Sequence, residues 1–174
     1  VSVRFRIYRK EAYLEGPHLP GPGGLPLGVT GRVMVLFSGG IDSPVAAWYM
    51  MRRGCRCEFV HVHAFGDPAE VHRTKIPGLV RALAAPQGVR ASLRLVPYDV
   101  YQFAAAQARI PQDLGLTIFR RFLFRVADAA AARARCAAIV TGDNLAQVAS
   151  QTMANLGAVH GITARPVYRP LLAM

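Results

Sequence analysis

Residues 35–46 read V-L-F-S-G-G-I-D-S-P-V-A and join an apolar run to the start of a helix. The run spans residues 33–37, and a continuous apolar stretch of this length is typical of a strand buried on both faces of a parallel sheet. A helix is predicted over residues 44–53, with Ser43 as its N-cap and Pro44 at its first position. A buried strand that leads directly into a helix is the repeating unit of an α/β fold.

The loop between this strand and this helix, S-G-G-I-D-S at residues 38–43, has the composition of a phosphate-binding loop. Its glycines let backbone N–H groups approach an anion, and the positive end of the helix points at the same place. The alternative is a simple turn between strand and helix. The sequence has no G-x-x-x-x-G-K-[ST] motif and no G-x-G-x-x-G after a strand. The loop lacks a lysine, while Asp42 could hold Mg²⁺, so these residues favour release of pyrophosphate over phosphoryl transfer.

Short apolar runs alternate with helical segments on the carboxyl side of this loop. Pro77 predicts a break or kink in the first helix after the second strand. This alternation predicts a doubly wound, mostly parallel five-stranded sheet with helices on both faces. The further predicted strands span residues 57–63, 93–97 and 137–141, with a short one around 166–168, and the further helices span 67–85, 100–108, 117–135 and 145–155.

The amino-terminal part of the chain differs from the rest. Residues 3–8 alternate apolar and polar side chains, as a half-buried strand does, and residues 15–28 contain four prolines and five glycines. We therefore expect residues 1–15 to be the carboxyl-terminal remnant of another domain and residues 16–31 to be a linker. Residues 32–174 form the main domain, which we expect to be truncated at its carboxyl end.

Charge indicates the class of partner. The chain has 21 Lys+Arg against 10 Asp+Glu, a net charge of +11, and only Lys10 and Lys75 are lysines. Such an excess favours a polyanionic partner such as nucleic acid over a merely soluble basic surface. No apolar run reaches the length of about 18 residues that a membrane helix needs, so no membrane is expected as a partner.

The three cysteines, Cys55, Cys57 and Cys136, are an odd number without a C-x-x-C pair. This usage indicates a reducing, cytoplasmic setting. Cys55 and Cys57 could form a redox or metal pair, with His61 and His63 as further ligands. We expect them instead to be small buried side chains, because a zinc site needs more well-placed ligands.

A second loop, T-G-D-N, follows the strand predicted at 137–141, so both loops are expected at carboxyl ends of strands, where open parallel sheets bind ligands. The first loop is the signature of PP-loop (pyrophosphatase-loop) adenylating enzymes, and within that group the chain resembles the tRNA 4-thiouridine synthetase family, ThiI. The matching segment at residues 140–152 separates this family from other PP-loop enzymes. The segments are P-G-P-G-G-L-P-L-G at 20–28, L-F-S-G-G-I-D-S-P-V-A-A-W at 36–48, M-M-R-R-G at 50–54, V-H-V-H at 60–63, T-I-F-R-R-F-L-F-R at 117–125 and V-T-G-D-N-L-A-Q-V-A-S-Q-T at 140–152.

The resemblance implies a two-stage reaction. ATP, with Mg²⁺, adenylates the C4 oxygen of a tRNA uridine near position 8, pyrophosphate leaves, and persulfide sulfur displaces AMP to give 4-thiouridine. Ser38 and Asp42 are the implied catalytic residues, and Asp42 is also the candidate magnesium ligand. The implied phosphate cradle is Ser38, Gly39, Gly40, Asp42 and Ser43, and the implied nucleotide pocket adds Leu36, Phe37, His61, Val62, Arg120, Gly142 and Gln151.

Three of these residues have a structural alternative. Arg120 could be a solvated charge on a helix face, Gln151 could be a helix-surface residue, and His61 could be a core histidine with its hydrogen bonds satisfied. Ala146 departs from the family pattern, which usually has glycine there, and Pro77 is unusual within its helix.

The resemblance also implies partners. The family binds tRNA and takes sulfur from a persulfide donor, a cysteine desulfurase or a rhodanese domain. A homodimer and a link to thiamine biosynthesis are further possibilities. Residues 1–15 would be the end of a THUMP domain, and Cys136 does not match the family's sulfur-handling cysteine. An isolated piece of this kind is expected to bind ATP but to modify tRNA poorly.

Two other functions stay open at this level. One is another PP-loop ligase, of the amidotransferase type or a deazaguanine nitrile synthase, although V-A-S-Q-T is not their signature. The other is a nucleotide-binding regulatory module of the same fold that binds ATP and never releases pyrophosphate.

Overall fold

The computed structural model describes residues 3–17, 20–21, 23–111, 113–148 and 151–174. Its main body is a five-stranded sheet in the order β5-β4-β3-β6-β7, and every neighbouring pair is parallel. Chain order reverses between β3 and β6, so the doubly wound sheet predicted from the sequence is confirmed. The strands are β3 Arg32–Leu36, β4 Arg56–His63, β5 Leu93–Pro97, β6 Ala138–Val140 and β7 Val167–Tyr168.

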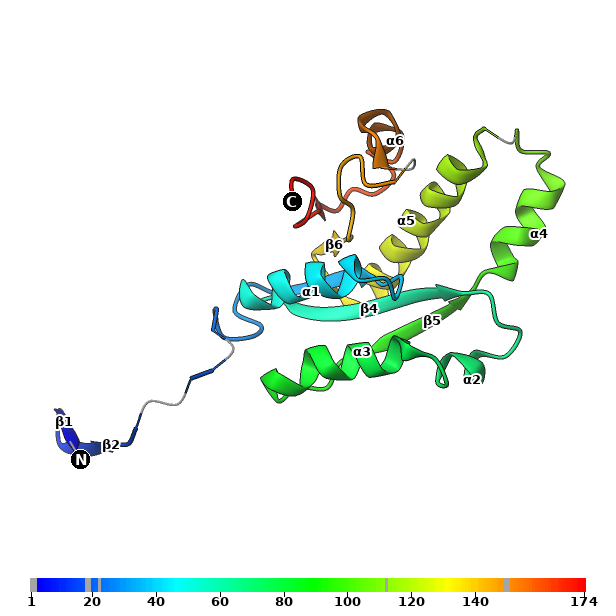
Figure 1. The fold of residues 1–174 in the computed structure, drawn as a ribbon. Helices are drawn as coiled ribbons and strands as arrows, with labels where there is room; N and C mark the ends of the chain where they lie inside the picture. The colour runs from blue at the N-terminus through cyan, green and yellow to red at the C-terminus, as the bar shows by residue number, and fades with distance from the viewer. Residues whose placement is uncertain (1–2, 18–19, 22, 112, 149–150) are drawn as a thin grey trace.

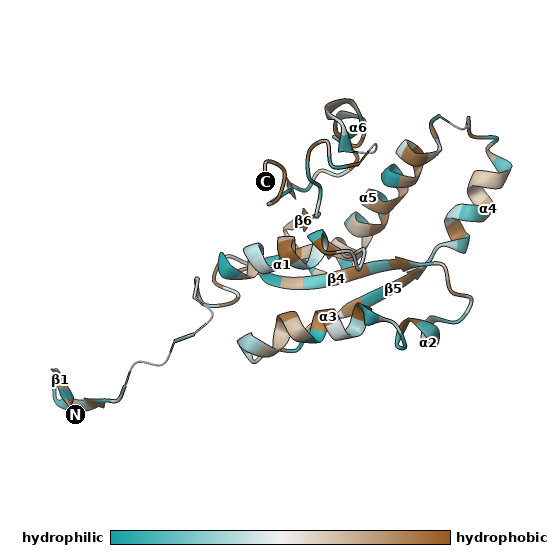
Figure 2. Ribbon diagram, viewed as in Figure 1, coloured by the Kyte–Doolittle hydropathy of each residue, from teal (hydrophilic) through white to brown (hydrophobic). Residues whose placement is uncertain are grey.

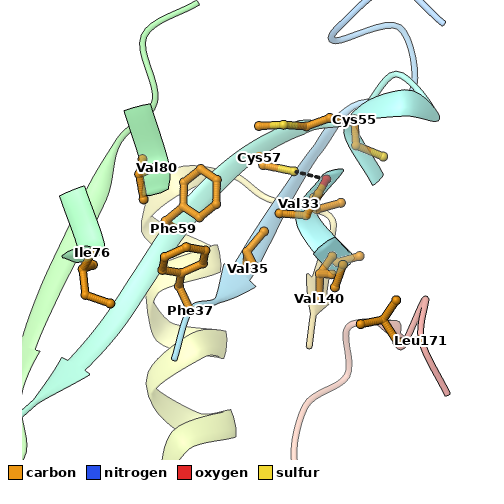
Figure 3. Close-up of a cluster of buried hydrophobic side chains, with 14 of the residues drawn as sticks. Val33, Val35, Phe37, Cys55, Cys57, Phe59, Ile76, Val80, Val140 and Leu171 are labelled. Atoms are coloured by element: carbon orange, nitrogen blue, oxygen red, sulfur yellow. Dashed lines mark hydrogen bonds between the residues drawn. The ribbon is translucent and has the colours of Figure 1, made fainter. Parts of the chain in front are cut away.

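Helices cover both faces of the sheet (Figure 1). On one face, α1 (Asp42–Arg52) and α3 (Lys75–Ala84) pack on the cluster that contains Val33, Val35 and Phe59. Figure 3 shows this cluster, in which Ile76 of α3 lies on the side of Phe37 and Phe59. On the other face α5 (Gly115–Ala134) brings four small residues against Met34 and Ile139; these are Ala127, Ala130, Ala131 and Ala134, which are spaced as one helix face requires.

The amino-terminal segment forms an antiparallel hairpin of β1 (Arg4–Tyr8) and β2 (Glu11–Glu15). The strand predicted at 3–8 is present, but the expected half-burial is wrong, since Phe5 and Ile7 are 71% and 78% exposed. Both faces of β1 are open to solvent, and hydrophobic as well as hydrophilic residues lie along it (Figure 2). The sequence pattern did not predict β2. The segment after β2 then reaches α1, where the Leu25 N–H donates to the carbonyl of Arg52, the last residue of that helix.

The helix predicted over 67–85 is two helices. The first, α2 (Pro68–Val71), starts at the Asp67 cap, and α3 starts after Thr74, whose hydroxyl accepts from the Ile76 N–H. Pro77 therefore lies in the first turn of α3, where its missing N–H costs nothing, and the break precedes it. A 3₁₀ turn at Ala85–Gln87 follows α3.

Two further helix predictions are corrected. Ser43 is not the N-cap of α1: the helix already begins at Asp42, and Ser43 is buried inside its first turn. The helix predicted at 145–155 is wrong over residues 145–148 and is present over 153–155. Residues 145–148 form turns, Ala146 has a φ of 62°, and α6 begins only at Met153 and ends at Ala158. Positions 149–150 lie outside the described residues. The remaining helix, α4 (Asp99–Gln107), is within one residue of its prediction.

Candidate nucleotide-binding site

A cavity of about 340 Å³ opens where the carboxyl ends of β3, β4 and β6 meet. This is the point at which the strand order reverses, where open α/β sheets bind their ligands. The walls come from the S-G-G-I-D-S loop, from the end of β4, from α5 and from the loop after β6. The lining residues are Leu36, Phe37, Ser38, Asp42, Ser43, His61, Val62, Phe119, Arg120, Leu123, Phe124, Thr141, Gly142, Asp143 and Gln151.

The loop is held by its two serines. The Ser43 hydroxyl accepts from the Ser38 N–H at 3.2 Å and lies 3.3 Å from the Ser38 hydroxyl, which in turn accepts from the Gly40 N–H at 3.4 Å. Gly39 has a φ of 76°, in the left-handed region that favours glycine. Ile41, at the N-cap position of α1, makes no side-chain capping bond. The backbone groups at the start of α1 are thus left for an anion rather than for a serine cap.

Gly142 brings the second loop into direct contact with the first. A Cβ at this position would lie 2.7 Å from the Ser43 nitrogen and 2.8 Å from the Asp42 carbonyl carbon. No side chain fits there without moving backbone. The T-G-D-N loop therefore packs on the start of α1, and Gly142 has a steric reason to be glycine.

Asp143 joins two arginines at the wall of the cavity. Its carboxylate accepts from Arg120 at 2.9 Å, from Arg169 at 3.2 Å and from the Thr141 hydroxyl at 2.9 Å. Only 11% of the Arg120 side chain and 9% of the Asp143 side chain are exposed, so the alternative of a solvated Arg120 is wrong. The two guanidinium groups exceed the one carboxylate by a single positive charge, which suits an anionic ligand.

His61 contributes a neutral ring. Its Nδ1 lies 2.7 Å from the Phe37 carbonyl oxygen, which can only accept, so Nδ1 carries the proton. Burial lowers the pKa of His61, and the bond to Phe37 offsets only part of that effect. The ring is therefore uncharged near neutral pH, with Nε2 as an acceptor. The histidine does have a satisfied bond, as the structural alternative proposed, and it also lines the cavity.

Gln151 is buried, and within the described part of the chain its Oε1 has no hydrogen-bond partner. The alternative of a helix-surface residue is wrong. A buried amide oxygen at the wall of a cavity is in place to accept from a ligand. The sequence analysis did not assign Phe119, Leu123 or Phe124 to the site, because apolar side chains on a long helix are equally expected in a core. They form the apolar wall of the cavity.

The chain resembles known proteins along most of its length. The model of the family described as Thiamine biosynthesis protein (ThiI) matches residues 28–174. This chain belongs to the ThiI family.

Two curated relatives carry the name probable tRNA sulfurtransferase. The relative from Moorella thermoacetica is 43% identical over 173 residues, which are 98% of this chain and 43% of that protein. The relative from Thermus thermophilus is 45% identical over 168 residues, 96% of this chain and 41% of that protein. The chain thus spans less than half the length of these ThiI relatives.

Two solved structures share the fold of this chain. A 4-thiouridine synthetase–RNA complex with bound ATP has a TM-score of 0.82 and 34% identity, and covers 98% of this chain and 44% of that chain. PH1313 from Pyrococcus horikoshii shares the fold, with a TM-score of 0.65 at 18% identity over 99% of this chain and 46% of that chain.

The structure places ten of the twelve residues selected by the ThiI resemblance on the cavity wall. The other two, Gly39 and Gly40, lie in the same loop but off the wall. Asp143, which the T-G-D-N motif contains, was not selected, and Arg169 had no signal in the sequence at all.

Other sites considered for this ThiI chain find no support. Cys55, Cys57 and Cys136 are free and buried, as expected for small core side chains. Burial raises the pKa of the Cys57 thiol, so it is protonated. In the described residues no group of three or more His, Cys, Asp or Glu side chains could hold a metal ion. No helix there has both the length and the hydropathy of a membrane span.

Proposed function

We propose that the full-length protein adenylates a tRNA uridine with ATP and so activates it for conversion to 4-thiouridine. The observation that carries this proposal is the S-G-G-I-D-S loop packed on the T-G-D-N loop at the point where the strand order reverses. The likeness to a 4-thiouridine synthetase that binds RNA and ATP supports it. The net charge of +11 suits a tRNA partner.

The chemistry assigned to the site is nucleotidyl transfer. The C4 oxygen of uracil attacks the α-phosphorus of ATP, forming an O–P bond. The bond from that phosphorus to the bridging oxygen breaks, and its electron pair leaves on pyrophosphate. The uracil gives up its N3 proton to solvent. The terminal sulfur of a persulfide then attacks C4, the C4–O bond breaks, and AMP leaves with its electron pair. A second thiol attacks the donor-side sulfur of the resulting S–S bond, so that the donor sulfur ends in a disulfide. The transferred sulfur stays on C4 as the thione of 4-thiouridine, which regains its N3 proton.

We assign roles within the cavity as follows. The start of α1, with Ser38 and Ser43, holds phosphate oxygens, because backbone donors converge there without a side-chain cap. The adenosine lies against the apolar wall, within reach of the Gln151 amide oxygen and His61 Nε2. Asp42, whose carboxylate lines the same cavity, would hold Mg²⁺, and the ion would neutralise phosphate charge.

The membership of the ThiI family supports inferences about localisation and partners. We infer a cytoplasmic enzyme with a cysteine desulfurase or rhodanese domain as persulfide donor; a second copy in a homodimer and a role in thiamine biosynthesis stay predictions. No observation favours another PP-loop ligase or a module without chemistry.

The test uses the full-length protein, ATP, magnesium and unmodified tRNA. We expect pyrophosphate release that requires tRNA, and 4-thiouridine in the digested tRNA once a persulfide donor is added. Pyrophosphate release at the same rate without tRNA, or ATP binding with no release at all, would contradict the proposal. The second outcome would favour a regulatory module.

A further inference from the structure

The start of α3 lies against the phosphate-binding loop, although α3 belongs to none of the motifs that define the loop. The loop residue that α3 touches is Gly39. A Cβ on Gly39 would overlap Cδ1 of Ile76 and would lie 3.9 Å from Cε of Lys75. The missing side chain of Gly39 therefore lets the first turn of α3 approach the loop.

The position of Lys75 is fixed by its neighbours. Thr74 caps α3 through its hydroxyl, and Ile76 is only 5% exposed and belongs to the cluster that also contains Phe37. Figure 3 shows Ile76 on the side of this cluster where Phe37 lies. The backbone of Lys75 is thus anchored between a capping residue and a core residue, while its side chain is exposed.

The ammonium group of Lys75 is not neutralised by a neighbouring carboxylate within the described structure. No carboxylate forms an ion pair with it among the described residues, whereas Arg120 and Arg169 share Asp143. The only other lysine, Lys10, lies in the turn between β1 and β2. Lys75 is therefore the lysine that the fold brings beside the loop, where the sequence motif itself has none.

A departing pyrophosphate needs such a cation. When the bond between the α-phosphorus and the bridging oxygen breaks, the electron pair and the charge move onto the pyrophosphate. A long, flexible lysine stem carries an ammonium group to phosphate oxygens as a point charge. The ammonium keeps its proton in this role and only pairs with the oxygens.

We propose that Lys75 binds the β- and γ-phosphates of ATP and the pyrophosphate that leaves. The inference rests on the proposed function, and it adds to that function a residue from α3 that lies outside every motif of the loop. Gly39 is then glycine partly because a side chain there would overlap Ile76 and displace the first turn of α3, which carries Lys75.

The test compares three variants of the full-length protein: Lys75→Ala, Lys75→Arg and, as matched control, Lys10→Ala. Calorimetry measures the affinity of each for ATP, for pyrophosphate and for AMP. We expect Lys75→Ala to weaken ATP and pyrophosphate binding about tenfold, as the loss of one charge-assisted contact does, and to leave AMP binding unchanged. Lys75→Arg restores most of the affinity, and Lys10→Ala behaves like the wild type.

AMP is the internal control, since it lacks the β- and γ-phosphates. Equal weakening of ATP and AMP would overturn the proposal, because it would mean that Lys75 only supports the fold. Unchanged pyrophosphate affinity in Lys75→Ala would overturn it as well. If the wild type binds pyrophosphate through Lys75 but releases none in the presence of tRNA, the proposed function fails and the assignment of Lys75 stands.

Discussion

Arg120 of α5 donates to Asp143 at 2.9 Å across 23 residues of chain, and both side chains are almost entirely buried. Arg169 donates to the other carboxylate oxygen at 3.2 Å. One aspartate therefore ties α5, the loop after β6 and the segment after β7 together at the wall of the cavity.

We expect Asp143→Asn to destabilise the protein by about 3 kcal/mol, because it leaves two buried guanidinium groups without their anion. Urea unfolding measures the change. Asp128→Asn is the matched control: Asp128 pairs with Arg165, but both side chains are about one-third exposed, so a loss of at most about 1 kcal/mol is expected. Equal losses in the two variants would show that the burial of Asp143 is unimportant.

Asp42→Ala should reduce tRNA-dependent pyrophosphate release by about 100-fold or more, since the site loses the carboxylate assigned to magnesium at the phosphates. The rate is measured at saturating ATP. Asp99→Ala is the control, because Asp99 accepts from the Val100 N–H at the start of α4 and does not line the cavity. An unchanged rate in Asp42→Ala would remove that aspartate from the mechanism.

Stability should fall as the pH drops below about 6.5 through the lowered pKa of His61. The unfolded chain protonates this histidine more readily than the folded one does, because burial lowers the pKa in the folded state. The neutral His61 ring therefore contributes to the free energy of unfolding above the pKa that this histidine has in the unfolded chain. This contribution is lost as the pH falls through the lowered pKa of the folded protein. Urea unfolding between about pH 5 and 8 measures it. His61→Gln should flatten this dependence, whereas His72→Gln, at an exposed position, should not.

The affinity for tRNA should fall steeply with salt. A net charge of +11 implies several phosphate contacts, each of which releases counterions. We expect a loss of at least about tenfold between about 50 and 200 mM salt, measured by filter binding. A flat response would exclude an electrostatic tRNA surface.

The sequence predicts the sheet well, because a strand buried on both faces must be a continuous apolar run, as residues 33–37 are. It also predicts the two loops of the site, residues 38–43 and 141–144. Each follows a predicted strand, and the carboxyl ends of parallel strands lie at the same edge of the sheet. It fails where a local signal competes with tertiary contacts. Ser43 looks like a cap, yet its hydroxyl holds the Ser38 N–H of the loop instead. Lys75 lies beside Gly39, and Arg169 beside Asp143, only through packing of distant segments, which no local pattern encodes.

Ala146 offers a test of backbone strain. Its φ of 62° lies in the left-handed region, which costs a residue with a Cβ about 1 kcal/mol relative to glycine. We expect Ala146→Gly to stabilise the protein by about 1 kcal/mol in urea unfolding. Ala132→Gly is the control of opposite sign: this exposed position lies inside α5, where glycine costs about 1 kcal/mol. A loss of stability in both variants would mean that Ala146 is not strained and that the turn at 145–148 is held by other contacts, such as the bond from the Ala146 N–H to the Gln151 carbonyl.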